Sequence, residues 1–199
     1  MSVAVIDYDR RMARWEPDSR GRLELAALAL YGERGFESAT VAEIAKRAGL
    51  TERTFFRHFA DKREVLFGGA GALQEALVAP VAAAPASAAP LEAAAEGLEA
   101  AGALLQGRPD AARQRQRIIV ANAELREREL IKLASLAAAL ADALRVRGVA
   151  EPAASLTAEV AIAAFRIAFE RWVDEANRRD MVALIRESLD ELKAVTAGV

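Results

Sequence analysis

The chain has 199 residues and a formal net charge of −2 at pH 7, with 53% hydrophobic and 28% charged residues, which is typical of a globular protein that can bury a core. It has no cysteine and a single histidine, His58. These counts exclude disulfides, thiol nucleophiles, cysteine-ligated zinc and histidine-rich metal sites, so we expect no metal. They leave few pairs of nucleophile and base other than Asp, Glu and Lys, and we expect no cofactor and no enzyme. The N-terminus does not resemble a secretory signal and no apolar stretch predicts a membrane span, so we expect a cytoplasmic protein that does not interact with membranes.

The charge is distributed unevenly along the chain. Residues 10–67 contain 12 basic and 9 acidic side chains, whereas residues 68–199 contain 15 basic and 18 acidic ones. The positive excess therefore lies in the N-terminal third, which is where a nucleic-acid contact would be sought.

The chain is predicted to begin with an irregular arm that leads into a helix. Residues 1–17 show no helical period and carry several arginines, so we expect a flexible N-terminal arm. A helix is predicted from residue 18 or 19, because apolar residues then recur at helical spacing, and Gly35 is placed to end it. The apolar positions are Leu23, Ala26, Ala27, Leu30 and Tyr31.

Two short helices are predicted next. Thr40 with Glu43 forms a capping-box pattern that starts the first of them, and Gly49 permits the tight turn that ends it. Thr51 is a good N-cap for the second, which runs to Phe59. The pattern predicts two short helices joined by a tight turn.

A fourth helix is predicted to begin at the capping pattern Asp61–Glu64 and to end before the proline-rich stretch 80–90. Glycines at 68, 69 and 71 interrupt it. They indicate either a loosened helix or a hinge, and no phosphate-binding motif follows them.

The rest of the chain predicts five longer helices. They are placed at about 91–105, 109–120, 125–144, 152–172 and 180–192. Strand-like alternation is absent from the sequence. We therefore expect an all-α fold.

Residues 40–59 match the plan of a helix-turn-helix, in which the second helix enters the major groove. Arginine can read guanine there and glutamate can accept from cytosine, while groups at helix starts can hold phosphate. His58 is expected to face phosphate or to pack, with a titrating switch as the other option. The predicted DNA contacts are Thr40, Thr51, Glu52, Arg53, Thr54, Phe56, Arg57, His58 and Lys62.

Residues 18–67 resemble the TetR family of regulators. The residues that carry the resemblance are Arg22-Leu23, Ala26-Ala27, Gly35-Phe36, Thr40-Val41, Ile44-Ala45, Ala48-Gly49, Thr51, Thr54-Phe55-Phe56, His58-Phe59, Lys62 and Val65-Leu66. The resemblance implies a three-helix helix-turn-helix DNA-binding domain, which we place at 18–66, and a six-helix ligand-binding and dimerisation domain, which we place at 67–199. It also implies a homodimer that binds double-stranded operator DNA and that a small-molecule effector releases. The family usually has tyrosine at the position of Phe56, and a phenylalanine lacks the hydroxyl that would hold a phosphate.

The C-terminal half looks like the family branch described as having an acyl-CoA-like ligand domain, through Arg117-Ile118-Ile119, Glu124–Arg128, Phe169 and Trp172. This resemblance favours an apolar or acyl-bearing effector. The predicted ligand-binding residues are Leu73, Leu77, Leu105, Ile118, Ile119, Phe165 and Phe169. The predicted dimerisation residues are Trp172, Met181, Leu184, Ile185 and Leu189.

Three alternatives stay open at this point. The basic run Arg108–Arg117 is either a solvated face paired with acids such as Asp110 and Glu124 or an anchor for an anionic ligand group. The chain could be a helical ligand-binding protein or an enzyme whose N-terminal helices are scaffold. A DNA-binding activator is the third possibility.

Overall fold

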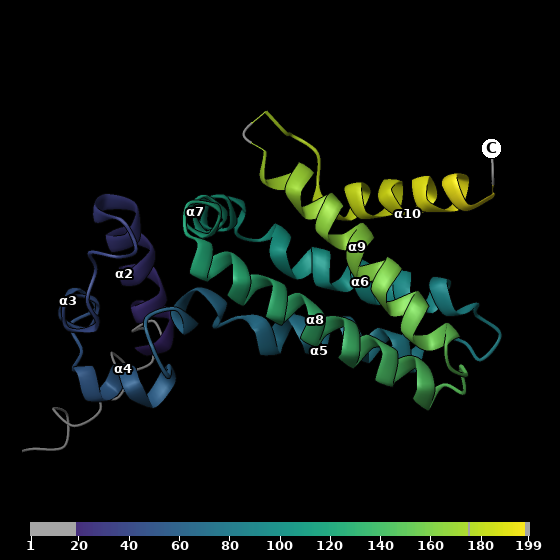
Figure 1. Ribbon diagram of the computed structural model, residues 1–199, viewed down its shortest axis with the longest axis horizontal. Helices are drawn as coiled ribbons and strands as arrows, with labels where there is room; N and C mark the ends of the chain where they lie inside the picture. The colour runs from purple at the N-terminus through teal and green to yellow at the C-terminus, as the bar shows by residue number, and fades with distance from the viewer. Residues whose placement is uncertain (1–18, 175, 198–199) are drawn as a thin grey trace, which may run out of the picture. The chain divides into compact units, whose positions relative to one another are not determined.

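The computed structural model describes residues 19–174 and 176–197, and these form two compact units that divide between Gly68 and Gly69 (Figure 1). The predicted N-terminal arm lies outside the described residues. Within the described residues there are nine α-helices, one 3₁₀ helix and no strand. The expectation of an all-α protein is therefore confirmed.

The described part of unit 1 contains three α-helices and the 3₁₀ helix. They are α2 (Ser19–Arg34), α3 (Val41–Arg47), α4 (Glu52–His58) and η1 (Glu64–Phe67). The helices meet around Leu23, Ile44 and Phe55, none of which has measurable exposed surface. Gly35 (φ 83°) ends α2 and Gly49 (φ 65°) turns the chain between α3 and α4, a backbone region that glycine adopts without a steric cost.

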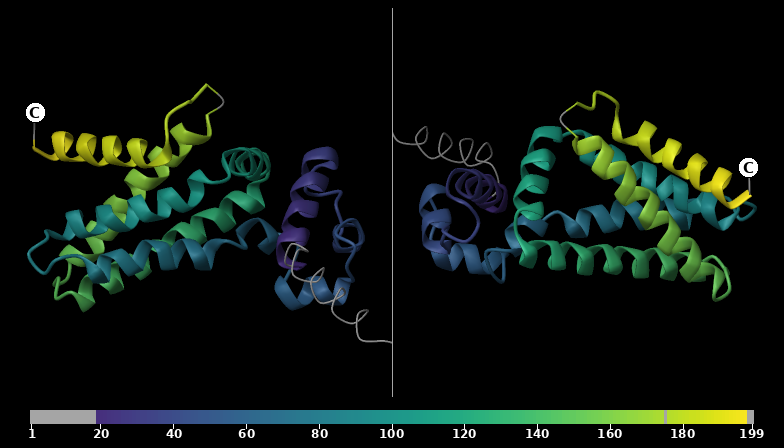
Figure 2. Two further views of the ribbon diagram at one scale, coloured as in Figure 1. Left: turned by 180° about the vertical axis from the view of Figure 1, so that it is seen from behind. Right: turned by 45° about the horizontal axis from the view of Figure 1, so that its top comes forward.

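Unit 2 contains six α-helices. They are α5 (Ala70–Ala83), α6 (Pro90–Gln106), α7 (Pro109–Val120), α8 (Ala123–Val146), α9 (Ala153–Val173) and α10 (Met181–Ala197). In Figures 1 and 2, α5 lies along α8 and α9 lies next to α10, and both pairs are in contact. The five helices predicted after residue 90 correspond to α6–α10. The helix predicted to begin at Asp61 begins later, because Glu64–Phe67 form η1 and α5 starts at Ala70.

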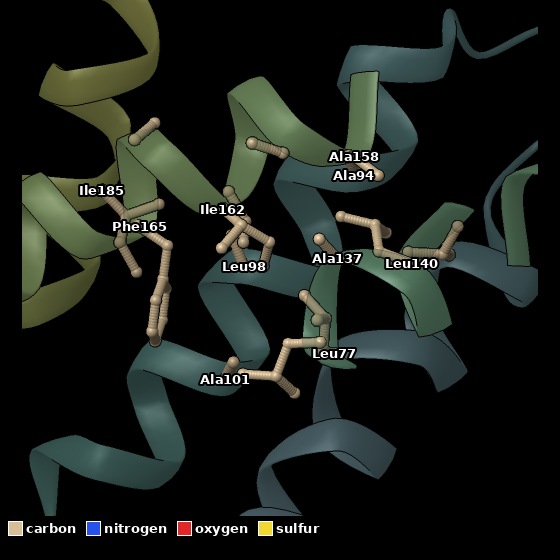
Figure 3. Close-up of a cluster of buried hydrophobic side chains, with 14 of the residues drawn as sticks. Leu77, Ala94, Leu98, Ala101, Ala137, Leu140, Ala158, Ile162, Phe165 and Ile185 are labelled. Atoms are coloured by element: carbon tan, nitrogen blue, oxygen red, sulfur yellow. The ribbon is translucent and has the colours of Figure 1, made fainter. Parts of the chain in front are cut away.

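The core of unit 2 is made of small and branched apolar side chains from five of these helices. Figure 3 shows Leu77 of α5, Leu98 of α6, Leu140 of α8 and Phe165 of α9 converging, with alanines between them. Because alanine has almost no side chain, the helix axes can approach closely where it alternates with leucine.

The expectation that the fourth helix ends before Pro80 is wrong. Helix α5 begins at Ala70 and runs through Pro80 to Ala83. Burial of Leu77 and Val81 favours continuation. Arg147, which directly follows α8, donates to the carbonyls of Val81 (3.0 Å) and Ala84 (2.6 Å) beyond the proline. Those bonds satisfy acceptors that the end of a helix leaves open.

The segment Glu64–Ala83 is apolar and long enough by composition to cross a membrane. Its structure indicates a different role, because η1 and α5 divide it and the 14 residues of α5 rise only about 21 Å, against a bilayer core of about 30 Å. Leu77 and Val81 also pack into the core of unit 2. We interpret α5 as a core helix.

Candidate DNA-binding site

The first helix of the predicted motif is fixed at both ends. The Thr40 hydroxyl accepts from the Glu43 backbone N–H (3.2 Å) and the Glu43 carboxylate accepts from the Thr40 N–H (3.0 Å), which is the predicted capping box. At the other end, the Leu50 N–H donates to the Ala45 carbonyl (2.8 Å). The turn into the next helix is therefore closed by backbone bonds.

The second helix, α4, is divided into a buried and an exposed side. Phe55 is fully buried and its ring lies 5.5 Å from the ring of Phe59. Thr51 caps the helix by accepting from the Thr54 N–H (3.2 Å). The buried phenylalanine fixes the rotation of α4, and that rotation decides which side chains face outward.

Most predicted DNA contacts lie on the exposed side of unit 1. Exposed side chains are Thr40, Thr51, Glu52, Arg53, Phe56 and Arg57, while Thr54 and His58 are half-buried. Phe56 is 55% exposed, with its ring edge against Phe55. An outward phenylalanine cannot donate to a phosphate, so it is suited to an apolar contact with a sugar or a thymine methyl.

His58 is tied to the first helix of the unit. Its Nε2 lies 3.0 Å from the Ser19 hydroxyl, and Arg57 Nη2 lies 3.5 Å from the same nitrogen. This placement corresponds to the packing option of the sequence prediction, since the ring links α4 to the start of α2.

The phosphate contact of Lys62 stays a prediction, and the structure gives its side chain a second role. Its ammonium donates to three backbone carbonyls, of Phe36 (3.0 Å), Glu37 (3.1 Å) and Ala39 (3.2 Å), and lies 4.5 Å from the centre of the Phe36 ring. An ammonium has three N–H donors, and all three have an acceptor within unit 1. We therefore assign Lys62 a structural role.

Sequence reasoning missed an exposed lysine at the end of α3. Lys46 lies in the last turn of α3 and is exposed, whereas its neighbour Arg47 forms two bonds to the Glu33 carboxylate (2.5 and 2.6 Å). In this motif the first helix crosses the DNA backbone. Its position in the last turn of the first motif helix could have identified Lys46 as a candidate phosphate contact from the sequence.

Three comparisons with known proteins bear on this unit. Residues 25–67 match the family model "Bacterial regulatory proteins, tetR family". A 61-residue segment is 43% identical to the HTH-type transcriptional regulator TcmR of Streptomyces glaucescens, and covers 31% of this chain and 27% of TcmR. This unit is therefore similar to the TetR family of bacterial regulatory proteins.

Solved structures extend the similarity over the whole TetR fold. FadR of Bacillus halodurans superimposes with a TM-score of 0.63 at 20% identity, covering 86% of this chain and 96% of that one. FadR of Thermus thermophilus, solved in complex with lauroyl-CoA, gives a TM-score of 0.56 at 22% identity over 87% and 93% of the two chains. A TetR-family regulator of Syntrophomonas wolfei gives 0.66 at 15% identity over 91% and 96%. At these identities the likeness shows the fold.

The predicted ligand residues lie in or around the core of unit 2. Leu77, Ile118, Ile119 and Phe165 are buried, and Leu73, Leu105 and Phe169 pack partly buried against the core. None of the seven lines the cleft of about 490 Å³ that the structure shows in this unit. Ligand contact by these residues stays a prediction.

The prediction for the dimerisation residues needs correction. Trp172, Met181, Leu184, Ile185 and Leu189 are each at most 3% exposed. The apolar stripe of α10 faces α6 and α9 of its own chain, so these side chains are already covered and cannot form an intermolecular surface. Periodicity identified a buried face but not which chain covers it.

Some arginines of the Arg108–Arg117 run form ion pairs within the chain, and some line the cleft. Arg115 donates to the Glu129 carboxylate of α8 (3.0 Å), and burial lowers the pKa of Arg115 while the charge of Glu129 opposes that shift. Arg113 pairs with Asp110 (3.2 Å), as the solvated-face reading expected, but Arg113 also lines the cleft together with Arg117.

Proposed function

We propose that this TetR-family chain is a repressor that binds a palindromic operator as a homodimer in the cytoplasm and that a small-molecule effector releases it. The observation that carries the proposal is the exposed face of α4, where Glu52, Arg53 and Arg57 project from a helix that Phe55 locks in place. Arginine and glutamate are readers of base edges in the major groove.

A stripe on α9 supports the homodimer. Leu156, Val160, Ala163 and Ile167 are exposed and follow each other at spacings of four, three and four, so they form one apolar line along the helix. Two such lines, related by a two-fold axis, would cover each other. A dimer would also present two recognition helices, which must lie roughly 34 Å apart to enter successive major grooves.

The release step requires an effector that prefers one state of the dimer. A ligand shifts an equilibrium only by its difference in affinity for the two states. The sequence favours an apolar or acyl-bearing effector, and the similar fold of Thermus thermophilus FadR was solved with lauroyl-CoA. Lauroyl-CoA is therefore the first effector to test for loss of operator binding.

The operator can be located by footprinting the purified protein on the DNA that flanks its own gene. We expect a palindromic footprint, and we expect Arg53→Ala to lower affinity for that site by about 1–3 kcal/mol while relaxing base preference. Lys193→Ala, an exposed lysine on α10 of unit 2, serves as the control and should bind as the unmodified protein does.

The outcomes separate the rival functions. Equal affinity for flanking and random DNA would contradict the proposal and favour a helical ligand-binding protein or enzyme. A reporter gene placed behind the operator that rises, rather than falls, with the protein would identify an activator.

A further inference from the structure

One aromatic side chain lies on the surface of unit 1. Of the phenylalanine, tyrosine and tryptophan side chains in the described residues, Phe56 on α4 is the only exposed one, at 55%. The others are buried, apart from the partly buried Phe169. A single exposed apolar side chain is common on proteins and needs no partner, so the surroundings of Phe56 must indicate what it does.

The ring of Phe56 is supported from behind by the core of unit 1. Its centre lies 5.5 Å from that of Phe55, with the two ring planes at 82°, which is a favourable edge-to-face arrangement. Phe55 is fully buried, and its ring lies 5.5 Å from the buried Phe59. Phe56 is therefore held on one side and open on the other, so it loses little side-chain freedom when a partner covers it.

Phe56 shares its face of α4 with two predicted base readers. Glu52 and Arg53 precede it by four and three residues, and all three side chains are exposed. At a rise of 1.5 Å per residue, Arg53 and Phe56 are about 4.5 Å apart along the helix axis, whereas successive base pairs are about 3.4 Å apart. If Arg53 reaches one base pair, Phe56 lies one or two base pairs from it.

The major groove offers one apolar group that suits a phenyl ring. The edges of the base pairs present hydrogen-bond donors and acceptors there, and thymine adds its C5-methyl group. A phenyl ring neither donates nor accepts an ordinary hydrogen bond, and covering a polar edge with it would desolvate that edge without compensation. The methyl group is therefore the partner in the groove that gains from contact with Phe56.

We propose that Phe56 determines operator specificity by covering the C5-methyl group of one thymine in each half-site. This inference rests on the proposed function, in which α4 enters the major groove. The selected thymine lies within two base pairs of the position whose base preference Arg53→Ala relaxes. Burial of one methyl-sized group changes affinity by about fourfold.

Replacing thymine with uracil tests the contact directly, because deoxyuridine lacks only the methyl group and pairs as thymidine does. Once footprinting has located the operator, its thymines are replaced one symmetric pair at a time. Binding of the full-length protein to each duplex is measured by fluorescence anisotropy. We expect a pair within two base pairs of the Arg53 position to weaken binding at least fourfold when it carries uracil.

Variants of Phe56 assign the effect to this side chain. Phe56→Ala should bind the thymine operator at least fourfold more weakly and should bind the thymine and uracil operators equally well. Phe56→Leu, which stays apolar, should keep part of the preference for thymine. Leu25→Ala is the control, because Leu25 is 61% exposed on α2 of the same unit, and it should keep the full preference. Circular dichroism verifies that each variant is folded.

The possible failures are distinguishable. A footprint whose affinity is unchanged by uracil at every position would overturn this inference and leave the proposed function intact. A uracil effect that persists in Phe56→Ala would also overturn it, because another side chain of α4, such as Thr54, would then contact the methyl group. The absence of any footprint would overturn the proposed function and this inference together.

Discussion

Lys62 is a single side chain that we expect to stabilise unit 1 through its contacts within the chain. The Lys62 ammonium donates to three carbonyls in the segment after α2. The backbone carbonyl of Lys62 accepts from the Tyr31 hydroxyl (2.6 Å). We expect Lys62→Met, which keeps the aliphatic stem, to lower the free energy of unfolding by about 1–2 kcal/mol, because charge-assisted bonds to partly buried carbonyls are lost. Thermal unfolding followed by circular dichroism measures the effect.

Lys46→Met is the matched control at the same scale. Lys46 is exposed at the end of α3, so its loss should leave the unfolding temperature unchanged, weaken binding to all DNA sequences alike and reduce the salt slope by about one. If Lys62→Met instead unfolds like the unmodified protein and lowers the salt slope, then Lys62 contacts phosphate and our assignment fails.

Residue types and caps were predictable here, but the partners of long basic side chains were not. The capping box of Thr40 and Glu43 involves neighbours in sequence, so the local pattern identifies it. The nearest acceptor of Lys62 in sequence is 23 residues away. Glu129, which pairs with Arg115, is 14 residues away. A flexible side chain reaches several acceptors, and the fold alone determines which acceptor is near.

At the scale of the helix, Gly97 determines how closely α5 and α6 approach. A Cβ built on Gly97 would lie 2.2 Å from the Leu77 carbonyl oxygen and 3.0 Å from Val81 Cγ2. A backbone carbonyl within a helix cannot turn aside, so the two helices would have to separate. We expect Gly97→Ala to lower the free energy of unfolding by about 1–3 kcal/mol, the usual cost of overpacking, as measured by denaturant titration.

We expect Gly71→Ala to change the free energy of unfolding in the opposite direction. Gly71 is exposed in α5, and its Cβ would meet nothing within 4 Å. Alanine there should stabilise the protein by about 0.5–1 kcal/mol, because it restricts the unfolded chain more than glycine does. If both substitutions change the free energy of unfolding equally, the close approach of α5 and α6 does not require glycine at position 97.

Helix boundaries followed local rules until tertiary contacts opposed them. Gly148, with φ 88°, follows α8 as predicted, whereas the predicted end before Pro80 failed. The proline removes one backbone donor, but burial of Val81 and the bonds from Arg147 lie outside the local window. A sequence rule that weighs Pro80 alone has no access to them.

At the scale of the whole molecule, the apolar faces of α9 and α10 illustrate a limit of periodicity. The buried stripe of α10 looked like a dimer interface in sequence, yet it is covered by α6 and α9 of the same chain. Hydrophobic spacing reports that a face is buried and does not report by what. The exposed stripe of α9 became visible only when the intramolecular contacts were known.

Substitutions in the exposed apolar stripe of α9 test the proposed dimer most directly. Val160 is 38% and Ile167 46% exposed on α9. We expect Val160→Glu with Ile167→Glu to convert the dimer to a folded monomer in analytical ultracentrifugation, because two charges per chain would be desolvated in the interface. Operator affinity should fall by at least tenfold in the same protein, since a monomer contacts one half-site.

Leu130→Glu separates interface disruption from a general effect of surface charge. Leu130 is 63% exposed and lies on α8, not on α9, so this variant should stay dimeric and bind operator as the unmodified protein does. A dimer that survives both α9 charges but dissociates with Leu130→Glu would place the interface on α8. Because the palindrome and the two-fold axis must match, that result would also predict a different spacing of the operator half-sites.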